Sequence, residues 1–412
     1  MRFFLPDASS PSPNLNIPSD AEGDPPLIDC ANVFDLLEQA TAQSPGHVYC
    51  RQGEECVSRR ELLGRVLTFA DRLAAAGFQP GDRVAVMLEN SIDYIVLVFA
   101  MAKMSLTWVP INTRLRGAGL AHILRHSEPR CLIADRALAP VITAASQGEP
   151  QCMILWQEES KSLLAESAEP HVPPAAAGTL PLGRHVFSIS YTSGTTGWAK
   201  GVIVTHKMMA AASQAVLHLA DVRDSDRMVM WEPLYHIGGS QLLLLPLLRL
   251  STLTLAGKFS SKNFLSLLRE AQATQLHYLG GVLQLMLKQP QSAKDKNHAL
   301  RIAWGGGAPS NIWRAFEERF GVTLRECYGM TETSSIVTCN IEGVVGSIGR
   351  PLSWFSVSIV KQDGTRAQPR ERGEIVVRQR VPGLLFEGYY KDEGTTRKAL
   401  RGDALHTGDL GS

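Results

Sequence analysis

The chain has 412 residues, and its 41 Lys and Arg against 40 Asp and Glu leave a formal net charge of +1. This balance argues against a protein that binds nucleic acid through bulk positive charge, which would show a basic excess. With 44% hydrophobic and 20% charged residues the composition is that of a globular protein, and the length suggests two or three domains. The apolar runs Tyr94–Ala102 and Leu242–Leu248 fall short of the roughly 20 residues of a membrane span, so none is expected.

The N-terminal segment predicts a tail rather than a folded element. Residues 1–26 are rich in Pro, Ser, Asn and Asp and lack apolar periodicity, so we expect a disordered tail. Met1–Leu5 runs into Pro6 and Asp7 without the apolar stretch of a secretory signal, so we expect a cytoplasmic protein. The seven cysteines are scattered without a C-x-x-C pair, and we interpret them as free thiols.

From residue 58 onward helices and strands alternate. Ser58 and Glu61 have the spacing of a capping box, and apolar residues then recur at helical intervals until Gly77, which predicts an amphipathic helix. Val84–Leu88 is a continuous apolar run, typical of a strand covered on both faces. Further helices are expected over 92–104 and 115–126, and further strands over 107–111, 131–134 and 153–156. The alternation predicts an α/β fold with largely parallel sheets.

Changes in composition suggest the domain limits. Four prolines between residues 169 and 184 mark a surface connection, and beyond residue 350 the pattern changes to short β-like pieces around a turn at Asp363-Gly364. We therefore predict two layered α/β subdomains, a small β-barrel-like subdomain and the start of a hinge. Their limits are 27–185, 186–350 (with a phosphate loop), 351–405 and 406–412.

The segment Tyr191–Gly201 carries the strongest chemical signal. It packs four Ser and Thr hydroxyls, three glycines and Lys200 into eleven positions. Glycines let backbone N–H groups approach phosphate oxygens, hydroxyls donate to them, and the lysine adds a point charge. The segment lacks the G-K-[ST] ending of a Walker loop, and strand-like Val202–Val204 follows where that loop requires a helix. A flexible Ser/Thr/Gly turn between two strands is an equal alternative on composition alone.

At this segment the sequence resembles the adenylate-forming superfamily of acyl-CoA synthetases, luciferases and peptide-synthetase adenylation domains. Further segments match family motifs in the same order along the chain, from about residue 30 to the end. They are Pro233–Gly239 (acyl pocket), Gly305–Pro309 (adenine-facing glycine strand), Tyr328–Thr333 (nucleotide and magnesium), and Gly388–Tyr390 with His406–Asp409 (ribose-proximal closing motifs). In pattern the chain is nearest to the large N-terminal domain of crotonobetaine/carnitine-CoA ligase-like and medium-chain acyl-CoA ligases.

The resemblance implies a carboxylate–CoA ligase that forms AMP. A carboxylic acid and ATP would give acyl-adenylate and pyrophosphate, followed by thioester formation with CoA; a homodimer is left open. Because two anions must meet, the site needs cations, which Lys200 and a Mg²⁺ held by Glu332 and Thr196 would supply. The resemblance gives catalytic roles to Lys200, His236, Thr331 and Glu332. The residues it gives to the nucleotide are Thr192, Ser193, Gly194, Thr195, Thr196, Gly197, Gly305, Gly306, Gly307, Glu326, Cys327, Tyr328, Gly329 and Asp409.

Each role has a plain competitor. Tyr328 offers a face for adenine stacking, and a buried core tyrosine is the alternative. Asp409 would accept hydrogen bonds from the ribose hydroxyls, or be a surface turn residue. His236 would border the acyl group, although a satisfied core histidine is the usual explanation of a histidine among apolar residues. Glu332 without its motif would read as a solvated loop residue.

The sequence also departs from the family. Ala199 stands where many members have proline, and the chain ends at Ser412, where members continue into a C-terminal lid domain. We therefore expect the lid to be absent and the fragment to be weakly active, because closure completes such sites. Two other functions stay open. One is an amino- or aryl-acid adenylation domain, disfavoured because the nearest carboxylate, Glu232, lies outside the expected position; the other is a non-catalytic nucleotide or acyl-ligand binding module.

Overall fold

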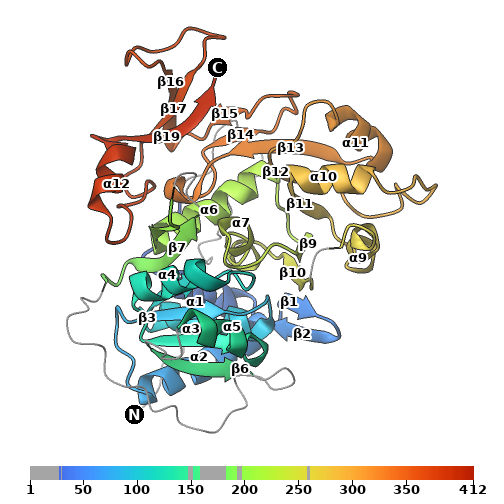
Figure 1. Ribbon diagram of the computed structural model, residues 1–412. Helices are drawn as coiled ribbons and strands as arrows, with labels where there is room; N and C mark the ends of the chain where they lie inside the picture. The colour runs from blue at the N-terminus through green and yellow to red at the C-terminus, as the bar shows by residue number, and fades with distance from the viewer. Residues whose placement is uncertain (1–26, 29, 147–151, 158–181, 193–196, 258–259) are drawn as a thin grey trace, which may run out of the picture.

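The computed structural model describes residues 27–28, 30–146, 152–157, 182–192, 197–257 and 260–412 (Figure 1). The tail expected at residues 1–26 lies outside this part of the chain, as does the middle of the phosphate loop, Ser193–Thr196. The described strands form three sheets.

One sheet has the strand order β6-β5-β3-β4-β7-β8. Its strands are β3 (Arg83–Met87), β4 (Thr107–Pro110), β5 (Cys131–Asp135), β6 (Met153–Gln157), β7 (Val186–Thr192) and β8 (Lys200–Thr205). All neighbours are parallel except β7 and β8, which pair antiparallel. Every residue of β3 and β4 is buried, as expected of central strands in a parallel sheet.

A second, nine-stranded sheet has the order β15-β14-β13-β12-β11-β9-β10-β1-β2. Its strands are β1 (Val48–Gln52), β2 (Glu55–Ser58), β9 (Arg227–Met230), β10 (Thr252–Leu255), β11 (Gln275–Leu279), β12 (Ile302–Gly306), β13 (Thr323–Tyr328), β14 (Thr338–Asn340) and β15 (Arg350–Pro351). The run from β1 to β13 is parallel, and the strands at both edges are antiparallel. Because β1 and β2 join this sheet while β7 and β8 complete the other, each sheet takes strands from both sides of residue 185.

Along the chain, most helices come between two strands. They are α1 (Val33–Gln43), α2 (Arg59–Ala75), α3 (Ile92–Lys103), α4 (Gly117–Ser127), α5 (Ala139–Ala145), α6 (His206–Leu219), α7 (Ile237–Ser240), α8 (Leu245–Leu248), α9 (Phe264–Glu270), α10 (Gly280–Leu287), α11 (Trp313–Phe320) and α12 (Glu393–Ala399), with 3-10 turns η1 (Arg136–Leu138) and η2 (Thr331–Thr333). The predicted capping box is confirmed at α2. Ser58 Oγ accepts from the Glu61 amide at 3.2 Å, and Glu61 Oε2 accepts from the Ser58 amide at 2.8 Å.

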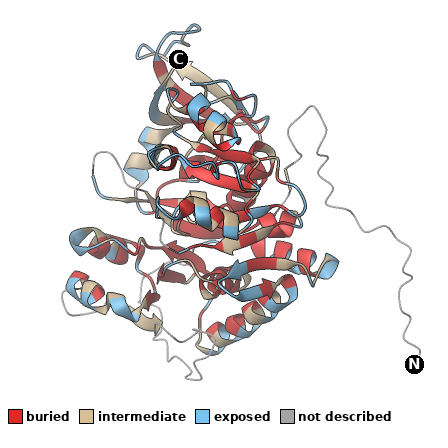
Figure 2. Ribbon diagram, turned by 90° about the vertical axis from the view of Figure 1, so that its right-hand side faces the viewer, coloured by how far each residue is buried: buried red, intermediate tan, exposed pale blue. Residues whose placement is uncertain are grey.

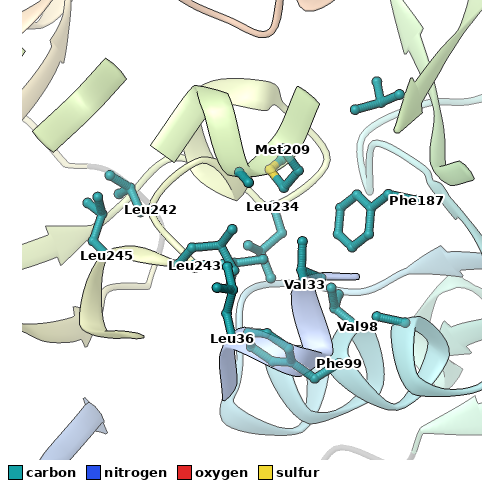
Figure 3. Packing of buried hydrophobic residues seen from close by; sticks show 14 of the residues in the cluster. Val33, Leu36, Val98, Phe99, Phe187, Met209, Leu234, Leu242, Leu243 and Leu245 are labelled. Carbon is teal, nitrogen blue, oxygen red and sulfur yellow. The ribbon is translucent and has the colours of Figure 1, made fainter. Parts of the chain in front are cut away.

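The largest core cluster joins the helices of both sheets. Figure 3 shows Val33 and Leu36 of α1 packed near Val98 and Phe99 of α3, with Leu234 and Leu243 above them. The Leu242–Leu248 run belongs to this core, because all of its leucines are at least 96% buried. Buried residues fill the sheets, while the outer faces of the helices are exposed (Figure 2).

A small sheet follows at the C-terminal end, at the top of Figure 1. It consists of β16 (Phe355–Val360), β17 (Gly373–Gln379), β18 (Leu400–Arg401) and β19 (Ala404–Gly411), in the order β16-β17-β19-β18 with antiparallel neighbours. Its described edge strands β16 and β18 do not pair with each other, so the sheet is open rather than closed into a barrel. The mixed α/β architecture with largely parallel sheets is confirmed; the exact subdomain limits stay a prediction.

Candidate functional site

A cavity of about 470 Å³ opens where strands of both α/β sheets end. Thr192, Leu279, Gly306 and Tyr328 are the last residues of β7, β11, β12 and β13, and all four line it. The carboxyl ends of parallel strands are where open α/β sheets bind ligands. Of the residues proposed from sequence, the cavity brings together Thr192, His236, Gly306, Gly307, Cys327, Tyr328, Gly329 and Thr331. Gly197, Lys200, Gly305, Glu326, Glu332 and Asp409 do not line it, and Ser193, Gly194, Thr195 and Thr196 lie outside the described residues.

The phosphate-loop segment joins two antiparallel strands. Thr192 at the end of β7 is paired with Lys200 at the start of β8, so the loop between them closes a hairpin. A strand therefore follows the loop, as predicted, instead of the helix of a Walker motif. Beyond the loop, Trp198 is 60% exposed and stacks on His122 of α4 with ring centroids 5.0 Å apart. His122 Nε2 also lies 3.0 Å from the Ala199 carbonyl oxygen, which fixes this end of the loop to α4.

Lys200 and Glu332 meet at Tyr389. The Tyr389 hydroxyl donates to Glu332 Oε1 at 2.8 Å, and Lys200 Nζ lies 5.1 Å from the centre of the Tyr389 ring. The segment around Tyr389 is held against β8, because the Tyr390 amide donates to the Gly201 carbonyl at 2.7 Å. Burial raises the pKa of Glu332, while the Tyr389 hydrogen bond and the Lys200 charge act to lower it. The result is a buried carboxylate beside a cation, adjoining Thr331 on the cavity wall.

A hydrogen bond between Tyr328 and Asp409 joins the end of β13 in the nine-stranded sheet to β19 in the small sheet. The Tyr328 hydroxyl donates to Asp409 Oδ2 at 2.7 Å, and Asp409 is exposed on β19. The Asp409 amide donates to Thr407 Oγ1 at 3.1 Å, and that hydroxyl in turn donates to the Ile375 carbonyl at 2.7 Å. Tyr328 is half-buried and lines the cavity, and the hydrogen bond to Asp409 anchors its hydroxyl. An exposed aspartate next to it has free acceptor capacity for hydroxyl donors.

The Glu326 carboxylate holds the turn that follows the glycine strand β12. Its carboxylate accepts from the amides of Gly307 at 2.6 Å and Ala308 at 3.1 Å, and from the Tyr278 hydroxyl at 2.9 Å. Burial raises the pKa of Glu326, and these hydrogen bonds partly offset the shift. The carboxylate is therefore committed to the turn after β12, whereas Gly306 and Gly307 themselves line the cavity.

His236 is exposed rather than a satisfied core histidine, so that alternative is wrong. It precedes α7, lines the cavity, and its ring lies 4.6 Å from the ring of Tyr235. Gly238 also lines the cavity, but Gly239, Gly280, Gly281 and Trp304 do not.

Two polar residues of this wall were not assigned to the site from the sequence. Glu232 and His277 both line the cavity, and their side chains are each only 7% exposed. From the sequence, Glu232 lies outside the position expected for a carboxylate that pairs with an amino-acid ammonium group. The turn after β9 nevertheless brings Glu232 to the cavity that His236 and Gly238 also line. The local sequence feature that could have indicated Glu232 as a site residue was a charged residue directly after the apolar run Met228–Trp231.

The geometry defines an α/β protein with a cavity at the ends of its strands, and comparison with known proteins identifies the class. The AMP-binding enzyme family matches residues 37–390, so the chain belongs to that family. It is 31% identical over 370 residues to the crotonobetaine/carnitine–CoA ligase of Salmonella paratyphi A, covering 83% of this chain and 69% of that one.

Two further similarities bear on the extent of the chain. It is 29% identical over 356 residues to mouse long-chain fatty acid transport protein 6, covering 80% of this chain and only 57% of the mouse protein. The N-terminal domain of FACL13 from Mycobacterium tuberculosis superposes with a TM-score of 0.80 at 26% identity, covering 92% of this chain and 97% of that domain. The chain thus has the fold of the large domain of acyl-CoA synthetases. Among the described residues, no helix combines the length and apolarity needed to cross a membrane.

Proposed function

We propose that the chain binds ATP and a carboxylic acid at the cavity and joins them as an acyl-adenylate. The observation that carries this proposal is the meeting of separate motif segments at one cavity: Thr192, His236, Gly306 and Tyr328 come from four different strands or loops and line the same space. The family's name and the CoA ligases among the relatives support the same chemistry.

ATP would lie along the strand ends. The Tyr328 ring would stack on adenine beside Gly306 and Gly307, and Asp409 would accept from the ribose hydroxyls. Lys200 and the hydroxyls of Ser193, Thr195 and Thr196 would bind the β- and γ-phosphates. The Thr192–Lys200 pairing supports this arrangement, because it places the cation at the loop's C-terminal end, next to a residue that lines the cavity.

Glu332 is suited to hold Mg²⁺. Mg²⁺ is usually bound through one or two carboxylates together with phosphate oxygens and water. Glu332 is 4% exposed and hydrogen-bonded by one hydroxyl, so its carboxylate retains acceptor capacity. A bound Mg²⁺ would neutralise charge on the triphosphate, and Thr196 is the second proposed neighbour.

In the reaction a carboxylate oxygen forms a bond to the α-phosphorus while the bond to pyrophosphate breaks, and pyrophosphate leaves with the electron pair. Lys200 would stabilise the charge that develops there, and His236 with Thr331 would border the reacting carboxylate. Transfer of the acyl group to CoA would need a C-terminal lid domain outside these 412 residues. On its own the chain would therefore form thioester slowly; a thioester rate equal to that of a lid-bearing form would contradict this.

ATP–pyrophosphate exchange driven by a panel of carboxylic acids tests the proposal. Exchange with simple carboxylates is expected, and exchange that depends on amino acids would favour the second candidate, an amino- or aryl-acid adenylation domain. The position of Glu232 in the cavity wall keeps that candidate open. Calorimetric binding of ATP with no exchange under any condition, including an added lid domain, would instead indicate a binding module.

A further inference from the structure

Glu232 and His277 form a buried polar pair within the acyl side of the cavity. Glu232 is 5% and His277 8% exposed, and both line the cavity together with His236. Neither residue has a role in the adenylation chemistry described above. Charged and polar side chains are rarely buried at such a place unless something compensates them.

The pair is left incompletely satisfied. Glu232 Oε2 and His277 Nδ1 approach to 3.1 Å, but without the angles of a hydrogen bond, so both atoms are sealed from solvent and have no hydrogen-bond partner in the described part of the chain. A buried carboxylate in this state lacks the donors that ordinarily offset its desolvation. Because Glu232 lines the cavity, a ligand there that carries a donor group could pair with its carboxylate.

The surroundings hold the pair in place. The His277 ring lies against Trp304, with centroids 4.4 Å apart, and the Trp231 indole N–H donates to the His277 carbonyl at 2.8 Å. Asn90 fixes the turn that carries Glu232, donating to the Glu232 carbonyl and accepting from the Leu234 amide, each at 2.9 Å.

Gly238 makes room for the carboxylate. A Cβ at Gly238 would lie 2.3 Å from Glu232 Oε2 and 2.8 Å from Oε1, so any larger residue would displace the group. The position of the carboxylate therefore depends on Gly238, which also lines the cavity, and on the turn that Asn90 holds. A polar group fixed at the wall of a pocket orients the ligand and contributes to specificity.

Building on the proposed function, we infer that Glu232 with His277 selects carboxylic acids whose acyl part carries a hydrogen-bond donor, a hydroxyl or an ammonium group. Such a donor would pair with the buried carboxylate on binding. A plain alkyl chain would leave it unpaired, and a second carboxylate on the substrate would meet it with like charge.

The test measures binding rather than turnover, so it does not depend on a lid. Non-hydrolysable acyl-sulfamoyl adenosines are prepared from straight-chain acids of four, six and eight carbons, in four forms: unsubstituted, terminal hydroxyl, terminal amino and terminal carboxyl. Isothermal titration calorimetry gives Kd for each. We expect the best hydroxyl or amino ligand to bind about 10- to 100-fold more tightly than the unsubstituted ligand of the same length, as for a hydrogen bond to a charged group.

Glu232→Gln preserves the shape of the side chain and removes its charge. In this variant the advantage of the donor-bearing ligand should fall to within about threefold, with the unsubstituted ligand bound at least as well as before. Glu55→Gln, which alters a carboxylate paired with Arg65 on the surface, serves as the matched control and should leave every ratio unchanged. If Glu232→Gln does not fold, His277→Gln takes its place. The ammonium ligand should then gain over the hydroxyl ligand, because the ring nitrogen 3.1 Å from the carboxylate oxygen is removed.

The outcomes separate the two proposals. Tight binding of all adenylates with no preference for a donor, or the same preference in Glu232→Gln as in the unaltered chain, would overturn the selection by Glu232 and leave adenylate binding intact. A failure of every adenylate to bind would contradict the proposed function, and the selection with it.

Discussion

The Tyr389 hydroxyl donates a 2.8 Å hydrogen bond to Glu332 Oε1, and the two residues are 57 positions apart in the sequence. The Phe386 amide donates to the Glu332 carbonyl at 2.9 Å, so the 386–390 segment holds both the backbone and the side chain of this residue. Because Lys200 lies over the Tyr389 ring, one tyrosine connects the proposed phosphate-binding lysine with the proposed metal-binding carboxylate. We expect substitutions of Tyr389 and of Lys200 to affect pyrophosphate exchange in ways that can be told apart.

Tyr389→Phe should lower kcat/KM for MgATP in pyrophosphate exchange by about 10- to 100-fold, because a hydrogen bond to a charged group contributes about 1.5–3 kcal/mol. The ring that packs under Lys200 is kept, so the loss reports on the orientation of Glu332. Tyr390→Phe is the matched control, since the Tyr390 hydroxyl makes no hydrogen bond to a described residue, and its activity should stay within about twofold of the unaltered chain. Equal losses in both variants would contradict the role of the hydrogen bond.

Lys200→Ala should reduce the exchange rate by about 10²–10³-fold if the ammonium group stabilises charge in the transition state. The measurement is made at saturating ATP and acid with a lid domain supplied, so that a change in binding does not mask the effect. Lys398→Ala removes an exposed lysine on α12 and should leave the rate unchanged. An unaltered rate in Lys200→Ala would remove this lysine from the mechanism.

Tyr328 permits its two proposed contacts to be separated. Tyr328→Phe keeps the stacking face and loses only the hydrogen bond to Asp409, so ATP affinity by calorimetry should change by less than about tenfold. Tyr328→Ala also removes the ring, and the additional loss should be about 0.5–1.5 kcal/mol of binding free energy. If Ala and Phe bound ATP equally well, the ring would not be stacking on the base.

Local signals in the sequence predicted much of the fold. The capping box of α2 and the buried run of β3 depend on neighbours within a few residues, and both are confirmed. Helix α1 was missed, although Asn32 caps it and its buried residues recur at helical spacing. The pairing of β1 with β10 joins Cys50 to Leu253, and no local pattern specifies a contact that distant.

In the candidate site too, local motifs predicted some features, and others depend on tertiary contacts. The motifs named most of the residues that the cavity brings together, but the direction in which each side chain points depends on tertiary contacts. Glu326 was grouped with nucleotide-binding residues, yet its carboxylate accepts hydrogen bonds from the Gly307 and Ala308 amides. Glu232 and His277 were not selected, because the contact between them joins a turn and a strand 45 residues away in sequence, 277 minus 232.

A buried histidine remote from the cavity gives a pH prediction. His206 at the start of α6 is 1% exposed, and burial lowers its pKa to about 4. Below pH about 6.5 the unfolded chain takes up a proton at this residue and the folded chain does not until about pH 4, so acidification through this window destabilises the fold by about 3 kcal/mol. Gln at this position can still accept from the Val33 amide, as His206 Nδ1 does at 3.3 Å.

The free energy of unfolding of His206→Gln, measured by denaturant titration from pH 7 to pH 4, should therefore fall less steeply than that of the unaltered chain. Both proteins share every other titrating group, so the difference between the two profiles isolates this one. Parallel profiles over the whole range would show that His206 is protonated equally in both states.

Substitution by alanine at two adjacent glycines of β12 should affect stability differently. A Cβ at Gly305 would lie 1.8 Å from the Tyr278 carbonyl oxygen, which is backbone of the neighbouring strand and cannot move aside cheaply, whereas the nearest atom to a Cβ at Gly306 is 3.5 Å away. Gly305→Ala should cost at least about 1–3 kcal/mol of stability, as overpacking does in a core. Gly306→Ala should melt within a few degrees of the unaltered chain.

The Gly305→Ala and Gly306→Ala variants should also be distinguished by their affinity for ATP. Gly306 lines the cavity and Gly305 does not, so the methyl group of Gly306→Ala would project near the space proposed for adenine. ATP affinity should fall in Gly306→Ala although its fold is intact, and calorimetry on the folded variant measures this directly. A Gly306→Ala protein that binds ATP as tightly as the unaltered chain would place the base elsewhere, and a fully stable Gly305→Ala would show that β11 and β12 can separate without loss.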